Sequence, residues 1–507
     1  MTGARVVSRL LAIVTAAVTV TLSGCAVGPD FKRPPAPPVD RYTRQPLPAA
    51  TASTAIAGGA AQRFAPGADI PGQWWALYHS APLNALIDDA LRANPSLQAA
   101  QAALRQAREV YLASVGNLFP SFDGNFRATR QKTSGSLFAA PGSNGVIFSL
   151  YNVQAQVSYT VDLFGGVRRQ IEENRATVDF QRFQFEASYL TLTSNVVTAA
   201  VRAAAVQAQI EAAEEVVAAR RRILDSVQRQ LEAGGASQAE VQQQLAQLAQ
   251  AQAALPPLRT QKAQLEHQLA ALTGRFPSQM SPLQLTLDQL TLPQQLPLSL
   301  PSKLVEQRPD VRAAEAQLHR ASAAVGVATA NLLPQFTITG FLGSVATHFG
   351  DLLSPGGGIW NLSGGVLIPF FHGGTLLHQK RAAVAAFEQA AAQYRSTVLN
   401  AFQNVADALR ALTDDADALQ AQHDAERAAK RSQDIAEQQY AAGAISYPVL
   451  LQAELTYQQT RSALALAQGA RFADTAALFQ ALGGGWWNRG DGDLAETAAP
   501  AAASSTR

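Results

Sequence analysis

The sequence predicts a mainly α-helical protein that also carries a few β-strands of the membrane type. Three observations support this fold class. Long stretches are rich in Ala, Gln, Leu, Glu and Arg, which favour helix. Short segments alternate strictly between apolar and polar residues, as in "NVQAQVSYTVDL". The same order of motifs occurs twice along the chain, which indicates an internal structural repeat.

The duplication is visible in several paired motifs. The first copy contains "RANPSLQAAQAALRQA" and the second contains "EQRPDVRAAEAQLHRA". Pro95 and Pro309 are 214 positions apart (309 minus 95), and Pro120 and Pro334 keep that spacing (334 minus 120). We predict a first repeat over residues 71–275 and a second over 302–485, joined by a linker at 276–301. Each repeat has the order helix, strand, strand, long helix, turn, helix.

The elements of both repeats follow from periodicity and from turn residues. A helix is expected from about residue 82 to 116, and long helices over about 167–233 and 375–442. Pro256 and Pro257 must interrupt the return helix of the first hairpin, because proline removes a donor and clashes with the preceding turn. A helix of about 65 residues is roughly 100 Å long. An ordinary antiparallel coiled coil remains a local alternative for these hairpins.

Four alternating segments are the expected strands, at about residues 121–131, 152–163, 335–345 and 359–369. Each has about ten residues, the length that a tilted strand needs to cross the hydrocarbon layer. Four strands cannot close a membrane barrel, for which about eight is the minimum. Several copies of the chain must then form one barrel together. Two copies would contribute eight strands and three copies would contribute twelve. The alternative is a small soluble sheet packed on helices.

The N-terminus has the features of an export signal. Arg5 and Arg9 precede the apolar run "LLAIVTAAVTVTL", which is too short for a comfortable membrane span. The run ends in "LSGC", which resembles the lipobox of bacterial lipoproteins, where the cysteine carries a lipid. We predict a signal peptide over residues 1–24 and a covalent lipid on Cys25, with an uncleaved signal anchor as the alternative. Ala26 indicates the outer membrane, because lipoproteins retained in the inner membrane typically carry Asp there.

Low-complexity segments flank the two repeats. Residues 25–70 are rich in Pro, Ala and Thr, which predicts an extended, non-core arm leading away from the lipid. Residues 486–507 include "GDGDLAETAAPAAASSTR" and are predicted to form a disordered tail.

Several classes of chemistry lack support in the sequence. The net charge is +2 and no basic cluster interleaves with aromatics, so no nucleic acid partner is expected. The single cysteine excludes an internal disulfide framework and a cysteine-rich metal site. The seven histidines are scattered without zinc-like spacing, and the glycine runs at 356–358 and 483–485 are not phosphate loops. We predict no catalytic site, no metal and no cofactor beyond the lipid.

The motifs in order resemble one known family. The span from "CAVGPDF" to "LGGGWW", with "WWALYHSAPLNALIDDALRANPSL", "VDLFGGVRR", "LVEQRPDVRAAEAQL" and "NLLPQFTITG", is similar to the TolC-like outer-membrane efflux channels, specifically their OprM/NodT lipoprotein subgroup. The resemblance implies a homotrimer with a twelve-stranded β-barrel, four strands per chain, and a long periplasmic α-helical barrel of coiled-coil hairpins. It also implies a passive exit duct for drugs or other small toxic molecules. The implied partners are a periplasmic adaptor (membrane fusion) protein and an inner-membrane transporter of the RND class.

The resemblance places the functional residues at the hairpin tips, which close the periplasmic end and dock the adaptor. The expected tips are Gly234, Gly235, Ala236 and Ser237 in the first repeat, and Gly443, Ala444, Ile445 and Ser446 in the second. Many relatives carry an acidic residue shortly after the second tip, whereas this chain has "VLLQAEL" with Gln452 there. We expect a gate lined by Val449 and Gln452, closed by packing and amide contacts rather than by an acidic ring.

Two rival functions remain from the sequence. One is the outer-membrane channel of a type I secretion system, against which the lipobox and the "GPDFKRP" arm favour the efflux subgroup. The other is a structural coiled-coil lipoprotein without a pore, against which the alternation of the strands argues.

Overall fold

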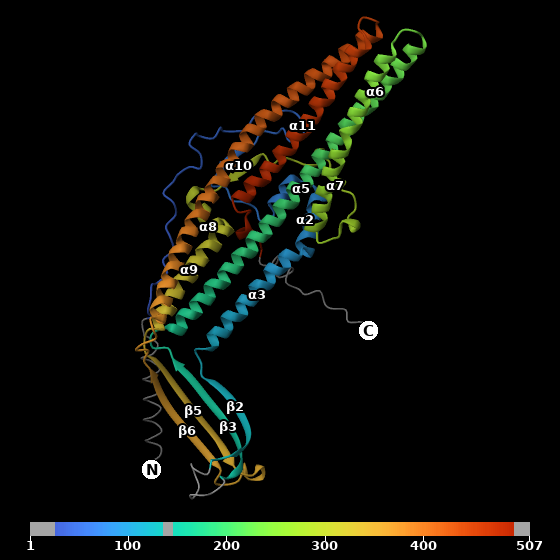
Figure 1. The fold of residues 1–507 in the computed structure, drawn as a ribbon. Coiled ribbons are helices and arrows are strands. Elements are labelled where there is room, and N and C mark those ends of the chain that lie inside the picture. Colours follow the sequence, from blue (N-terminus) through green and yellow to red (C-terminus); the bar gives the residue numbers. More distant parts are fainter. Residues whose placement is uncertain (1–25, 135–144, 491–507) are drawn as a thin grey trace. The chain divides into compact units, whose positions relative to one another are not determined.

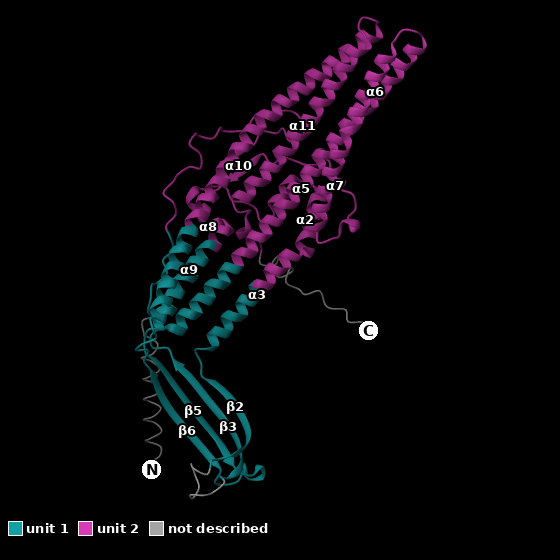
Figure 2. Ribbon diagram, viewed as in Figure 1, with its two compact units in different colours: residues 1–34, 104–181, 314–394 teal, residues 35–103, 182–313, 395–507 magenta. Residues whose placement is uncertain are grey.

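The computed structural model describes residues 26–134 and 145–490, and these form two compact units (Figure 2). Of the described residues, the first unit contains 26–34, 104–134, 145–181 and 314–394, and the second contains 35–103, 182–313 and 395–490. Each unit therefore contains segments from both sequence repeats. Figure 1 traces the elements in chain order.

The first unit holds a four-stranded antiparallel sheet in the order β2-β3-β5-β6. Its strands are β2 (Ser121–Lys132), β3 (Ile147–Val161), β5 (Gln335–Ala346) and β6 (Gly358–Leu367). Strand β3 starts five residues before its expected position, because the apolar stretch "IFSLY" continues the pairing with β2. Helices α3 (Pro95–Gly116) and α9 (Pro309–Ala330) each lead into one strand pair.

The two repeats give two helical hairpins whose tips lie in the second unit. The first consists of α5 (Gly166–Glu232), α6 (Gln238–Ala253) and α7 (Leu255–Leu272), and the second of α10 (Thr375–Ala441) and α11 (Tyr447–Ala481). Both long helices have 67 residues. The return helix of the first hairpin breaks at Ala254, and α7 restarts with proline in its first turn, as Pro256 and Pro257 require.

Aromatic side chains form part of the buried core of the second unit. Trp74 and Tyr78 lie on the short helix η1 (Trp74–Tyr78), which precedes α2 (Ala81–Ala93), and both are fully buried. The Trp74 ring stacks on Phe479 of α11 with centroids 5.3 Å apart. The Tyr78 hydroxyl donates to the Phe472 carbonyl at 2.8 Å. The end of the second hairpin is thereby fixed to the start of the first repeat.

The N-terminal arm is not the non-core segment that its composition predicts. Strand β1 (Arg63–Pro66) pairs in parallel with β4 (Gln295–Leu298) of the linker. Gln62 is fully buried, and its side-chain amide donates to the Pro293 carbonyl and to the Thr475 hydroxyl, each at 3.0 Å. The arm therefore contributes polar groups to the core. The remaining short helices are α8 (Pro301–Gln307), η2 (Pro277–Gln279), η3 (Leu287–Gln289), η4 (Phe349–Asp351) and η5 (Trp486–Asn488).

Two further expectations need correction. The helix expected over 82–116 is split at Asn94, because the residue before proline avoids helical geometry and the Asn94 side chain accepts from the Leu97 amide at 3.1 Å. The tail does not begin at residue 486. Trp486 donates to the Gln307 carbonyl at 2.6 Å, and Arg489 forms an ion pair with Glu186 in which both side chains are 4% exposed. Residues 491–507 lie outside the described residues.

Candidate functional site

The apolar side chains of the four strands share one face of the sheet. The register places Phe122 opposite Val157, Val157 opposite Gly340, and Gly340 opposite Leu362. The neighbouring row places Leu342 opposite Trp360. Because side chains alternate along a strand, all these residues point to the same side.

That apolar face is uncovered within the part of the chain that the structure describes. Phe122 is 78% exposed, Trp360 76% and Leu362 70%. An uncovered row of large apolar side chains across four strands is costly in water, and it marks a surface that contacts lipid or another protein.

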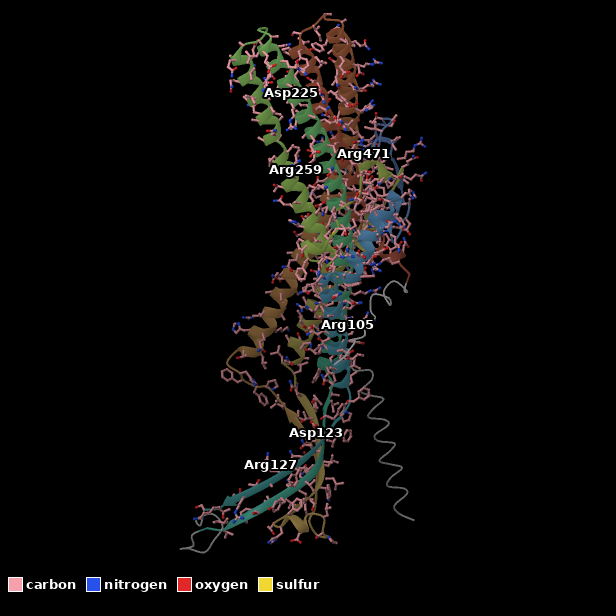
Figure 3. All side chains as sticks on the ribbon, turned by 90° about the vertical axis from the view of Figure 1, so that its right-hand side faces the viewer. Arg105, Asp123, Arg127, Asp225, Arg259 and Arg471 are labelled. Atoms are coloured by element: carbon pink, nitrogen blue, oxygen red, sulfur yellow. The ribbon has the colours of Figure 1, made fainter. Side chains whose placement is uncertain are left out.

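The opposite face of the sheet is polar. One row runs Ser158, Thr339, Ser363, with the hydroxyls of Thr339 and Ser363 2.9 Å apart. Asp123 and Arg127, labelled in Figure 3, lie on the same face of β2. The two outer strands, β2 and β6, pair with no further strand among the described residues. The sheet thus has one apolar face, one polar face and two open edges.

The hairpin tips are tight turns with different caps. Gly234 and Gly443 adopt the left-handed conformation, with φ of +74° and +72°, which glycine tolerates at a helix C-terminus. Ser237 accepts from the Glu240 amide while the Glu240 carboxylate accepts from the Ser237 amide, a complete capping box. Ser446 occupies the same place before α11, but its side chain makes no capping bond.

The expected gate residues lie together in a groove of about 870 Å³ between α10 and α11. Val449 is 51% exposed and lines the groove with Gln452. From α10 the groove receives Asp424, Arg427, Arg431, Ile435 and other residues. No acidic residue of α11 lines it.

Ion pairs between the two hairpins escaped the sequence analysis. Arg222 of α5 donates to Glu454 of α11 at 2.9 Å. Arg461 pairs with Glu215, which also accepts from Gln458 at 3.0 Å. Burial raises the pKa of Glu454, although the positive charge of Arg222 acts to lower it. Burial also acts on Glu215, but its hydrogen bond and charge contact with Arg461 outweigh burial and lower its pKa.

A second missed cluster, in the first unit, holds the segment that follows Cys25. The buried Arg169 guanidinium donates to the Val27 carbonyl at 3.0 Å, and pairs with Asp30 and Glu172 at 2.7 Å each. Glu172 is also 2.8 Å from a ring nitrogen of His319. These contacts give the "GPDF" motif a structural role.

A third missed cluster is polar and buried in the second unit. Arg471 is 1% exposed and donates to the Leu412 carbonyl at 2.8 Å and to the Thr51 hydroxyl at 3.2 Å. Burial, together with the neighbouring Asp415 carboxyl, raises the pKa of Asp474 to about 8. No sequence motif marks this cluster.

A family model matches the chain twice, over residues 86–275 and 300–484, and its description is outer membrane efflux protein. The chain belongs to this family. Together the two matches cover well over half of the sequence, and each falls on one copy of the internal repeat.

This outer membrane efflux protein has relatives of similar length. It is 29% identical to the pyoverdine export outer membrane protein OpmQ of Pseudomonas putida, over 82% of this chain and 88% of that protein. It is 28% identical to the toluene efflux pump outer membrane protein TtgC of P. putida, over 92% and 94%. The open-state structure of the Neisseria gonorrhoeae MtrE outer membrane channel matches with a TM-score of 0.76 and 27% identity, covering 91% of this chain and 99% of that one.

These findings confirm the fold class and the general function inferred from the sequence. The efflux protein has long helices and strands arranged in two family repeats, as in the solved channels. It is a bacterial outer membrane channel component of an efflux pump, and not an enzyme.

The individual site residues of the efflux protein stay predictions. Cys25 lies outside the described residues. The eight tip residues and the two gate residues occupy the turns and the groove given above. In the described ranges, no group of three or more His, Cys, Asp or Glu side chains is arranged to bind a metal ion. No helix in the same ranges is long and apolar enough to cross a bilayer.

Proposed function

We propose that three copies of this efflux protein assemble into the passive exit duct of a tripartite pump. The observation that supports this most is the sheet, with its uncovered apolar face and its two open edges, β2 and β6. If β6 of one copy pairs with β2 of the next, three copies give twelve strands and leave no edge. The apolar face then lies against hydrocarbon and the polar face lines a water-filled lumen.

The energy for export comes from a partner in this proposal. A periplasmic adaptor protein docks at the two hairpin tips, residues 234–237 and 443–446, and an RND-type transporter in the inner membrane drives the flux. A diacylglycerol lipid on Cys25 adds an anchor in the outer membrane. The relatives are named for pyoverdine and for toluene, which differ widely in chemistry. A wide duct that leaves selection to the pump accounts for that difference.

Planar-bilayer conductance of the purified mature protein tests the proposal. We expect discrete channel events from a species with three times the mass of one chain, measured by light scattering in detergent. A monomer that stays soluble without detergent, and gives no events, would contradict it. Events accompanied by secretion of a protein substrate would favour the type I secretion alternative.

Introducing an acidic residue at position 452 tests the proposed gate. We propose that Val449 and Gln452 line the constriction, so Gln452→Asp would place three carboxylates around the axis. Block by divalent cations should then appear at about millimolar concentration, since carboxylate oxygens are their preferred ligands. The matched control is Gln438→Asp, because Gln438 is exposed on α10 but does not line the groove. If both variants conduct like the parent in the presence of Mg²⁺, residue 452 does not line the pore.

A further inference from the structure

Only two charged side chains lie on the apolar face of the sheet. The register and the alternation of side chains define that face on all four strands. It consists of the even-numbered residues 122–132 of β2, the odd-numbered residues 147–161 of β3, and the even-numbered residues 336–346 of β5 and 358–366 of β6. Among these, Arg130 and Lys132 are charged and none is acidic. The apolar face therefore carries a purely positive charge, and all of it on one strand.

Both cations lie at the end of β2 that is farther from α3. Helix α3 ends at Gly116 and β2 begins at Ser121, so Lys132 is at the opposite end of the strand. Ten residues from Phe122 to Lys132 span about 34 Å along the strand, or about 26 Å along the membrane normal at a tilt of about 40°. The apolar band of an outer-membrane barrel is about 25 Å tall. With Phe122 at the periplasmic boundary of the hydrocarbon, the cations reach its outer boundary.

An aromatic cluster lies beside the two cations. Phe349 of η4, in the connection between β5 and β6, contacts Phe126 and Tyr151 of the apolar face, with ring centroids 6.3 and 5.7 Å apart. Tyr151 pairs with Ala128, two residues before Arg130 on β2. Aromatic side chains gather where hydrocarbon meets lipid headgroups. The cluster therefore marks the same boundary as the length of the strand does.

In the described ranges, no carboxylate neutralises these cations. Arg130 and Lys132 are both exposed, their partners across the ladder are uncharged, and neither forms an ion pair there. Asp351, the one acidic residue between β5 and β6, lies 3.7 Å from the His348 ring. Residues 135–144, which follow β2 and lie outside the described residues, include no Asp or Glu in their sequence. The anion that meets the two cations must come from outside this sheet.

We propose that Arg130 and Lys132 bind a phosphate group of a lipid in the outer leaflet of the outer membrane. The two residues are about 7 Å apart along one face of the strand, so both long side chains can reach one phosphate. The guanidinium donates two parallel hydrogen bonds to the phosphate oxygens, and the ammonium adds a compact positive charge. The acyl chains lie against the apolar face and Phe349. The site rests on the proposed barrel, and it assigns a headgroup chemistry to the lipid around it.

Native mass spectrometry of the detergent-purified protein tests the site with lipid A, a glycolipid whose headgroup carries two phosphates. The matched ligand is the same lipid with its phosphates removed. The parent should bind the phosphorylated form about thirtyfold more tightly, since each basic residue near an anionic headgroup contributes about fivefold. Arg130→Gln combined with Lys132→Gln should abolish that preference. Side chains that only reach into water would give no preference in either protein.

Arg127→Gln is the matched control for the double substitution. Arg127 also lies on β2, but alternation places it on the polar face (Figure 3). Its loss should leave the preference for phosphorylated lipid unchanged. Arg130→Lys combined with Lys132→Arg keeps both charges and should retain the preference. Light scattering shows whether each variant has the same mass as the parent.

Photochemical cross-linking in cells tests the contact without removing either cation. Ser149 lies opposite Arg130 on the apolar face, whereas its neighbour Leu150 points to the polar face. Ser149→p-benzoylphenylalanine should give an adduct that carries radioactive phosphorus from labelled lipid. The same side chain at Leu150 should give severalfold less of it. Equal labelling at the two positions would contradict a lipid at this end of β2.

The outcomes separate the lipid site from the proposed function. A conducting trimer in which the double variant prefers phosphorylated lipid as strongly as the parent does overturns the site and leaves the duct intact. An equal loss in Arg127→Gln also overturns it, because binding would then follow total charge and not position. A soluble monomer without conductance overturns the proposed function itself, and the lipid site with it.

Discussion

The sheet of the first unit and the helical core of the second unit place their apolar and charged groups in opposite ways. The sheet exposes Phe122, Trp360 and Leu362. The core instead buries Arg471, and also the Arg489–Glu186 ion pair. A water-soluble fold pays a large cost for either arrangement unless the exposed face meets lipid and the buried charges have partners. The contrast indicates that the sheet is suited to contact with lipid and the helical core to surroundings of water.

The largest effect is expected from removing the buried cation. Arg471→Leu leaves the Leu412 carbonyl and the Thr51 hydroxyl without their donor, and the nearby Asp415 carboxyl without a compensating charge. The loss should be about 3–5 kcal/mol of unfolding free energy. Thermal melting of the helical circular dichroism signal measures it. Arg410→Leu, at an exposed position of α10, is the control and should change little.

The next effect concerns the uncovered face of the sheet. Leu362→Arg places a charge where we expect hydrocarbon and should cost about 2–4 kcal/mol near the bilayer midplane. Its neighbour Ser363 points to the polar face, so Ser363→Arg should be tolerated. Urea titration of folding into lipid vesicles compares the two. Equal losses would mean that the apolar face does not meet lipid.

The smallest effect is a pH dependence of the core. Because the pKa of Asp474 is raised to about 8 in the folded protein, the folded state binds this proton more tightly than the unfolded state does. Stability is then fully present at acidic pH and falls as the pH rises from about 4 towards 8. The slope is below about 1.4 kcal/mol per pH unit, since solvent screens the partly exposed carboxyl. Asp474→Asn should flatten the dependence of melting temperature on pH, whereas an unchanged slope would assign it elsewhere.

Local patterns in the sequence predicted much of this fold. Alternation located the strands, and proline located the break at Ala254. The same logic applied to "RANPSL" would also have separated α2 from α3, because Asn94 precedes a proline. The start of β3 was harder to predict. Ile147, Phe148 and Leu150 place apolar side chains on both faces of the strand, so the alternation is lost there.

Contacts between distant segments were beyond the reach of sequence patterns. Arg222 and Glu454 are 232 positions apart, and their pairing depends on the register between two long helices. Arg169 meets Asp30 across 139 positions. A charged residue on a helix looks like a solvated surface residue until the helix beside it is known, so the sequence could not distinguish these side chains from others.

The hydrogen bonds that Arg169 donates to Val27 and Asp30 have a consequence for biogenesis. Only one residue separates Cys25 from Val27, so a tether of two peptide steps spans at most about 7 Å. So short a connection leaves no room for the enzymes that would process and acylate the cysteine. If Cys25 carries the lipid that we propose, its modification must precede docking of the segment, because a chain that docked earlier would block access to its own modification site.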